Sequence, residues 1–384
     1  MLTQICGKTL NGKPVTITAD NGVITTIEPL ITDTPENLPY VAAGLVDLQV
    51  NGYAGTDYNT LPLHRDDVRH SYERLYQKGV TSLCPTVITN SDEAISQLMA
   101  DFAGFCAADP RICASTAGIH LEGPFISPVS GPRGAHDKAC VQHCDTEKVR
   151  HWHSVSQGLL RILTLSPEQE DGLADTIRFC TENNIRVSVG HTAATPEQIR
   201  RAAELGVTMS THLGNGCELQ MHRHNNPIWA QLAEDSLWSG IITDGFHLPP
   251  SLIKVILRAK QGKILLTSDT TAFGGMAPGR YHTHIGGDVV LTEQGRLHLA
   301  ANEELLAGSA QSALECISFL NRSGLSDAEQ AWRYAAENPA AFLGLTDRGT
   351  LAAGKRADIV VLDIQGSTLQ VLETYLQGEA VYRA

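Results

Sequence analysis

The chain has 384 residues and a formal net charge of −13, from 29 basic and 42 acidic side chains. Its hydrophobic share of 42% is close to that of globular proteins, which excludes a wholly disordered chain. The acidic balance disfavours nucleic acid or an anionic membrane as a partner, since both need clustered lysine and arginine, and no apolar run is long enough for a transmembrane helix.

Both ends of the chain have the pattern of short strands separated by turns. At the N-terminal end, strands are predicted at residues 2–6, 15–19 and 23–27. At the C-terminal end, they are predicted at residues 358–363, 368–376 and 380–382. We therefore expect one small sheet domain built from residues 1–42 and 345–384.

The middle of the chain alternates short apolar runs with amphipathic stretches. The eight runs lie at residues 42–50, 79–88, 117–121, 159–165, 186–189, 207–211, 239–243 and 263–267. This rhythm over about 250 residues predicts a (β/α)₈ barrel for residues 43–344. The alternative is a doubly wound sheet, but residues 45–55 contain no glycine-rich nucleotide fingerprint after the first run.

Nine cysteines occur without a C-x-x-C pair. Their odd number and irregular spacing disfavour a disulfide framework or a structural zinc finger. We expect most of them to be buried thiols in a reducing compartment, the cytoplasm.

Metal-binding and proton-transferring residues follow several predicted strands. Glu122 follows the third, His191 the fifth, His212 the sixth and Asp269 the eighth. Catalytic groups of a barrel gather at the C-terminal ends of its strands, so these side chains are expected at one rim. Two imidazoles and a carboxylate suit Zn²⁺ or another first-row divalent ion with a position left for water, and Asp269 is placed to accept that water's proton.

Longer motifs around these residues resemble the amidohydrolase superfamily and, within it, the N-acetylglucosamine-6-phosphate deacetylase family. The matching segments are AGLVDLQVNGYAG at 43–55, HLEGPF at 120–125, GAH at 134–136, VGHTAAT at 189–195, THLGNG at 211–216, ITDGFH at 242–247, TSDTTAFGG at 267–275, LLAGSA at 305–310 and GTLAAGKRADIVVLD at 349–363. The resemblance implies a metal-dependent (β/α)₈ barrel with a small β-sandwich from both termini.

The resemblance also assigns roles. It implies one divalent ion per subunit, Zn²⁺ first and Fe²⁺, Co²⁺ or Mn²⁺ otherwise, held by Glu122, His191 and His212, with Asp269 as general acid and base and His136 near the acetamido carbonyl. Arg223 matches an arginine that reaches the substrate phosphate from the neighbouring subunit of a homodimer. The implied contacts to the sugar or phosphate are Ala135, His136, Asn215, Gly216, Asp244, His247, Leu306, Ala307 and Gly308.

Three departures from the family pattern bear on metal and substrate. Gln49 and Asn51 stand where many amidohydrolases carry two histidines, which favours a single-metal site. Gly214 replaces an aromatic residue, and residues 222–227 replace the usual Glu-Pro-Gly context of the arginine.

The expected reaction is deacetylation of N-acetylglucosamine 6-phosphate. The alternative is the same chemistry on a non-phosphorylated or epimeric N-acetylhexosamine, or on another N-acyl compound.

Weaker interpretations remain beside this one. Residues 222–224, His-Arg-His, form either an anion site or a solvated loop. The pairs His282/His284 and His151/His153 are minor candidates for a second metal site. A cyclic-amide hydrolase is disfavoured because the first predicted strand lacks both metal-binding histidines. A non-catalytic barrel predicts loss of a metal ligand or of Asp269, and none is lost.

Overall fold

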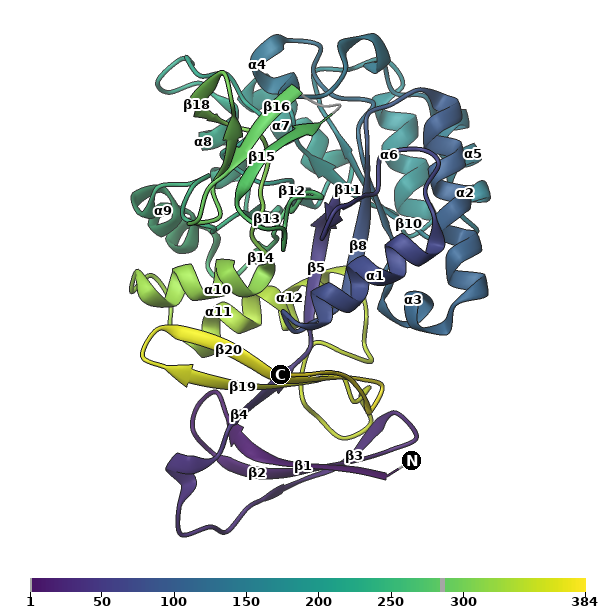
Figure 1. The fold of residues 1–384 in the computed structure, drawn as a ribbon. Helices are drawn as coiled ribbons and strands as arrows, with labels where there is room; N and C mark the ends of the chain where they lie inside the picture. Colours follow the sequence, from purple (N-terminus) through teal and green to yellow (C-terminus); the bar gives the residue numbers. More distant parts are fainter. Residues whose placement is uncertain (1, 284–286) are drawn as a thin grey trace.

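The computed structural model describes residues 2–283 and 287–384. Its centre is an eight-stranded parallel sheet in the order β14-β13-β12-β11-β10-β9-β8-β5 (Figure 1). The strands are β5 (Leu45–Val50), β8 (Val80–Ile88), β9 (Ile119–Glu122), β10 (Leu160–Leu165), β11 (Arg186–Val189), β12 (Met209–Ser210), β13 (Trp238–Ile241) and β14 (Ile264–Leu266). Each lies within or overlaps one of the eight predicted runs, so the predicted barrel is confirmed.

Helices surround the strands, and several of them begin at a residue whose side chain caps the first turn. Ser91 accepts a hydrogen bond from the amide of Ala94, and Thr195 forms a capping box with Gln198. The helices are α1 (Arg65–Tyr76), α2 (Asp92–Ala108), α3 (Pro110–Ser115), α4 (Ser130–Arg133), α5 (Thr146–Val155), α6 (Leu173–Glu182), α7 (Pro196–Leu205), α8 (Pro227–Ala233), α9 (Pro250–Lys260), α10 (Ala313–Arg322), α11 (Ala328–Ala335) and α12 (Glu337–Leu343). None of them in the described ranges combines the length and the apolarity that crossing a membrane requires.

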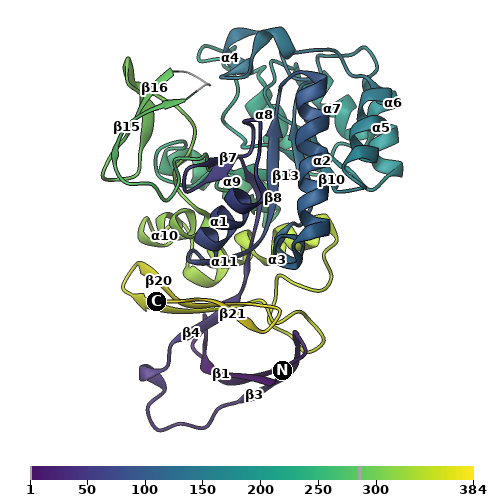
Figure 2. The ribbon, with the colours of Figure 1, turned by 45° about the vertical axis from the view of Figure 1, so that its right-hand side comes forward.

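Both chain ends form a second sheet beneath the barrel, in the order β21-β20-β19-β4-β1-β2-β3 (Figures 1 and 2). Its strands are β1 (Leu2–Thr9), β2 (Pro14–Asp20), β3 (Val23–Pro29), β4 (Tyr40–Ala43), β19 (Ile359–Gln365), β20 (Thr368–Leu376) and β21 (Glu379–Arg383). The antiparallel pairing of β4 with β19 joins the two ends, and the sheet encloses its own apolar cluster. The predicted domain from both termini is therefore present; its exact boundaries stay a prediction.

A third sheet was not predicted. It follows β14 and contains β15 (Gly279–Thr283), β16 (Gly287–Leu291), β17 (Leu297–Leu299) and β18 (Asn302–Leu306) in sequential antiparallel order. A short hairpin of β6 (Gly52–Tyr53) and β7 (Thr56–Asp57) follows β5. Figure 2 shows the third sheet standing beside the upper part of the barrel.

The first and last barrel strands, β5 and β14, meet at a seam held largely by side chains. The carboxylate of Asp47 on β5 accepts hydrogen bonds from the Thr267 hydroxyl, at 2.9 Å, and from the Ser268 amide, at 3.2 Å. Beyond these, Val50 forms an isolated parallel bridge with Thr270. Asp47 is buried, which raises the pKa of its carboxyl despite these hydrogen bonds. The seam fixes the backbone that leads to Asp269.

Candidate active site

Three predicted ligands meet at the rim above the parallel strands. Glu122 ends β9, while His191 and His212 follow β11 and β12. His212 Nε2 lies 2.9 Å from Glu122 Oε1 and 3.0 Å from His191 Nε2, and His191 Nε2 lies 3.3 Å from Glu122 Oε1. All three side chains are nearly inaccessible to solvent. The structure thus brings together the three residues that the sequence motifs indicate.

The proton on His191 can be placed from its second nitrogen. Its Nδ1 lies 2.8 Å from the carbonyl oxygen of Pro132, which can only accept a hydrogen bond. Nδ1 therefore donates, and Nε2 presents a lone pair to the carboxylate of Glu122 and to two other histidine nitrogens. A lone pair that faces a buried carboxylate calls for a cation between them. The donor set fits a divalent first-row metal ion.

His136 extends this group. Its Nε2 lies 3.2 Å from His191 Nε2, and its Nδ1 lies 2.8 Å from the hydroxyl of Thr89. Potential ligand atoms of Glu122, His136 and His191 all lie within 4.8 Å of one another. Two overlapping triplets therefore share Glu122 and His191, with either His212 or His136 as the third member. The tighter contacts belong to His212.

Electrostatics differ among the buried groups. Burial opposes ionisation of Glu122, but its contacts with His191 and His212 outweigh burial and hold the pKa of the carboxyl well below its usual range. Burial also opposes charge on His212, yet its contact with Glu122 raises the pKa of that ring. Burial, reinforced by the neighbouring His191, lowers the pKa of His136 to about 3, which keeps it neutral.

Asp269 lies next to the ligand cluster and is held by one amide. Asn51 Nδ2 donates to Asp269 Oδ1 at 2.7 Å, and the Asp269 backbone amide donates to the carbonyl of Gln49. Burial and the charge of Glu122 raise the pKa of Asp269 to about 6. A buried carboxylate beside the cluster can accept and return a proton, as the sequence predicts.

Three of these residues have left-handed backbones. The φ angles are 48° at His191, 29° at His212 and 50° at Asp269. Residues with a Cβ disfavour this region, and such strain concentrates at functional sites where the surroundings over-determine the geometry. The turn at each strand end aims the side chain inward across the rim.

Gln49 and Asn51 act differently from the histidines that they replace. Gln49 Nε2 donates to Glu122 Oε1 at 2.9 Å, just as Asn51 Nδ2 donates to Asp269. Their amide oxygens, Gln49 Oε1 and Asn51 Oδ1, are buried without a hydrogen-bond partner among the described residues. Their residue types disfavour both as metal ligands, and their contacts show a role that the sequence did not predict: they hold Glu122 and Asp269 in place.

A cavity of about 940 Å³ opens over the cluster. One wall comes from the third sheet and the loop before it, through Phe273, Met276, Tyr281 and Leu299. The predicted residues that line it are Glu122, Ala135, His136, His191, His212, Asn215, Gly216, His247, Asp269, Leu306, Ala307 and Gly308. Within the described ranges, this lining includes no lysine or arginine.

Asp244 and Arg223 do not line the cavity. The carboxylate of Asp244 accepts hydrogen bonds from the amides of Phe246 and His247 and lies 2.7 Å from His247 Nδ1. It thus orients His247, whose ring does line the cavity. Arg223 lies on an exposed loop, where its carbonyl accepts a hydrogen bond from Trp229 Nε1. Their direct contacts to substrate stay predictions.

The histidines beside Arg223 have local roles. His222 Nδ1 accepts hydrogen bonds from the backbone amides of His224 and Asn225, and the two histidine rings pack edge to face. These contacts shape the loop, and neither ring lines the cavity. The anion-site interpretation of residues 222–224 stays a prediction.

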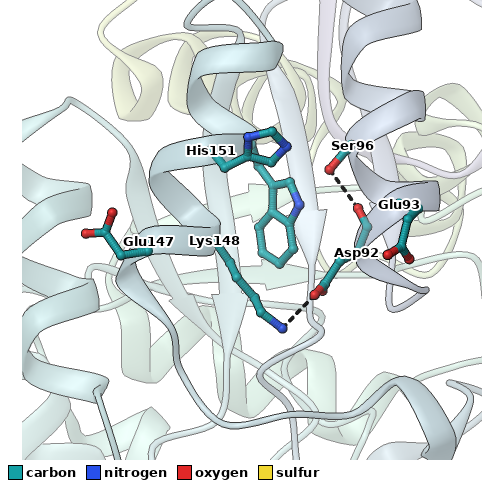
Figure 3. A pocket seen from close by; sticks show the side chains of 7 residues that line it. Asp92, Glu93, Ser96, Glu147, Lys148 and His151 are labelled. Atoms are coloured by element: carbon teal, nitrogen blue, oxygen red, sulfur yellow. Dashed lines mark hydrogen bonds and ion pairs between the residues drawn. The ribbon is translucent and has the colours of Figure 1, made fainter.

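The minor metal candidates lie apart from the centre. His151 borders a hollow of about 500 Å³ between α2 and α5, where the carboxylate of Asp92 is paired with Lys148 at 2.6 Å (Figure 3). His153, two residues along the same helix, packs against Phe179 instead. His282 pairs with Asp288, and His284 lies outside the described residues. Within those residues, none of these histidines belongs to a cluster of three potential ligands.

Comparisons with known proteins agree with this geometry. Residues 40–381 match the amidohydrolase family. The chain is 33% identical to the N-acetylglucosamine-6-phosphate deacetylase of Bacillus subtilis, over 88% of this chain and 84% of that protein. It is 31% identical to the N-acetylgalactosamine-6-phosphate deacetylase of Escherichia coli, over 94% of this chain and 92% of that protein. The solved structure of a mutant Mycobacterium smegmatis N-acetyl-D-glucosamine-6-phosphate deacetylase, in complex with N-acetyl-D-glucosamine-6-phosphate, has a TM-score of 0.85, 25% identity and 99% coverage of each chain.

Proposed function

The chain belongs to the amidohydrolase family, and we propose that it deacetylates N-acetylglucosamine 6-phosphate to glucosamine 6-phosphate and acetate. The observation that carries this proposal is the convergence of Glu122, His191, His212 and Asp269 at one rim, inside one cavity. Curated relatives named as amino-sugar-phosphate deacetylases support the substrate class.

We assign the metal ligands as Glu122, His191 and His212, with Zn²⁺ as the first candidate and Fe²⁺, Co²⁺ or Mn²⁺ as others. His212 is preferred over His136 as the third ligand because its Nε2 contacts both other members at 3.0 Å or less. When bound, such an ion lowers the pKa of a coordinated water toward neutrality and polarises a carbonyl.

The chain's own residues complete the reaction. The oxygen of Asp269 that faces away from Asn51 takes the proton of the attacking water and later delivers it to the departing amine nitrogen. His136 is neutral, so Nε2 can donate to the acetamido oxygen as charge develops there, provided that Thr89 donates to Nδ1. His247, oriented by Asp244, faces the sugar from the opposite side of the rim.

Phosphate recognition requires a cation that this chain's own cavity does not supply within the described residues. We propose that Arg223 supplies it from a second copy in a homodimer, since its loop is exposed and outside the cavity of its own chain. A guanidinium fork matches two phosphate oxygens. We also propose that the enzyme works in the cytoplasm, in line with the nine free cysteines.

A second candidate is deacetylation of an epimeric or non-phosphorylated N-acetylhexosamine. Two observations favour it: the cavity lining without lysine or arginine, and a galactosamine relative almost as similar as the glucosamine one. The test measures acetate release by metal-loaded protein from N-acetylglucosamine and N-acetylgalactosamine, each with and without the 6-phosphate. A kcat/KM highest for N-acetylglucosamine 6-phosphate supports the first proposal. Equal rates without phosphate support the second candidate, and no release from any of the four refutes both.

A further inference from the structure

Beneath the ligand cluster, four buried polar side chains form one hydrogen-bonded chain across the barrel interior. His120 Nδ1 lies 3.1 Å from the carbonyl oxygen of Leu48, and His120 Nε2 lies 2.7 Å from the Thr164 hydroxyl. The hydroxyls of Thr164 and Thr211 are 2.7 Å apart, and those of Ser188 and Thr211 are 2.6 Å apart. All four side chains are almost completely inaccessible to solvent. We call this set the interior polar chain.

The interior polar chain has one consistent direction. The carbonyl of Leu48 can only accept, so His120 Nδ1 donates to it. With the hydrogen of the imidazole on Nδ1, Nε2 carries the lone pair and accepts from Thr164. Each hydroxyl has one hydrogen, so Thr211 donates to Thr164 and Ser188 donates to Thr211. Removing any member leaves a buried neighbour without its hydrogen-bond partner.

The interior polar chain lies close to the three assigned metal ligands in sequence and in space. His120 precedes Glu122 by two positions on β9, and Thr211 directly precedes His212. Gly190, which precedes His191, packs so tightly on this chain that an added Cβ would lie 2.7 Å from the Thr164 methyl and 2.8 Å from Thr211 Cβ. Three ligands on three strands therefore share one buried support.

The ligand turns need such support. The left-handed φ angles at His191 and His212 are disfavoured for residues with a Cβ, and they persist only where neighbouring contacts fix them. Thr211 and Gly190 are the residues immediately before these two turns. Hydrogen bonds and close packing at those residues fix where each turn begins.

We propose that the interior polar chain of His120, Thr164, Thr211 and Ser188 is a positioning device that sets the geometry and affinity of the metal site. Its members are positioning residues, because they act through Glu122, His191 and His212. This inference rests on the proposed metal-dependent function, since it requires that a metal bind at those three residues.

The test replaces Thr164 with valine, which keeps the shape and removes the hydroxyl. His120 Nε2 then lacks a donor and Thr211 lacks an acceptor. We expect Co²⁺ to bind about 10–100-fold more weakly, the range typical for outer-shell changes at metal sites, with an altered visible spectrum of the bound ion. Thr164→Ser restores the hydroxyl and should restore both readouts. Ser188→Ala removes only the terminal donor and should give a smaller loss in the same direction.

Thr176→Val is the matched control. Thr176 is also fully buried, but it lies on helix α6 outside the barrel strands, where its hydroxyl is 3.2 Å from that of Thr146. A merely structural role lowers the urea midpoint of the metal-free protein in both valine variants but leaves Co²⁺ affinity and spectrum unchanged. If Thr164→Val and Ser188→Ala bind Co²⁺ like wild type, the inference is overturned. If wild type binds no Co²⁺ at all, the proposed metal-dependent function fails instead, which is a separate outcome.

Discussion

The sharpest prediction concerns Asp269→Asn. The asparagine oxygen can still accept the 2.7 Å hydrogen bond from Asn51, so the local arrangement is retained. The amide cannot take a proton from water at neutral pH. Loss of a general base costs about 10²–10⁴-fold in rate, so kcat should fall by that factor while KM changes little. Metal content should stay at the wild-type value.

The same substitution should stabilise the metal-free protein. Burial and the charge of Glu122 raise the pKa of Asp269 from 3.8 to about 6 in the folded state. The folded state then holds a proton more tightly than the unfolded chain, so the ionised carboxylate destabilises the fold increasingly as pH rises from about 4 to 6. By linkage this amounts to roughly 3 kcal/mol at neutral pH, and asparagine removes it.

The assay combines steady-state deacetylation kinetics with urea unfolding of metal-free protein at pH 5 and pH 7. The stability gain of the variant should be larger at pH 7 than at pH 5. Asp288→Asn serves as the control, because its carboxylate is exposed and lies on the third sheet. Near-normal kcat in Asp269→Asn refutes the assignment of the base. A loss of stability instead of a gain refutes the electrostatic reasoning.

Three further predictions concern the metal and the phosphate. Chelation should abolish activity and lower the Tm, and readdition should restore both at one ion per chain; two ions per chain by elemental analysis would contradict the single-metal site. His212→Ala should lose tightly bound metal, whereas His136→Ala should keep the metal and lose kcat; the reverse pattern would make His136 the third ligand. Arg223→Ala should lower kcat/KM about 10–150-fold for the phosphorylated sugar only, since a charge-assisted contact contributes about 1.5–3 kcal/mol. Equal loss on both sugars would refute a phosphate contact, and mixing Arg223→Ala with an Asp269→Asn partner should restore part of the activity if the arginine acts across a dimer.

The barrel was predictable because its strands are rich in apolar residues and recur between amphipathic stretches, as residues 159–165 illustrate. The site was predictable because the catalytic groups of such a barrel lie at the C-terminal ends of its strands, and those ends can be located in the sequence. The third sheet was missed because its short strands have few core positions: β15 alternates half-buried and exposed residues, and β18 is almost wholly exposed. Periodicity cannot separate such strands from loops.

The amides of Gln49 and Asn51 show a second limit of sequence reasoning. Their type excluded them as strong ligands, but their contacts with Glu122 and Asp269 depend on side-chain placement across the barrel. The same holds for the interior polar chain: His120 and Thr211 lie in predicted apolar runs, and only the folded barrel brings them into one hydrogen-bonded series with Thr164. Position next to a ligand in the sequence was the one available signal.

The shared sheet of the two termini has a consequence for synthesis on the ribosome. Strands β1 to β4 emerge first. One edge of β4 stays unpaired until its neighbour β19 is synthesised, and β19 begins more than 300 residues later. During that interval the pairing edge of β4 and the apolar side chains of Val41, Ala42 and Ala43 lack their final cover. An unpaired strand edge is a template for association between chains. Nascent chains stalled before residue 359 should therefore be the aggregation-prone and chaperone-dependent form of this protein.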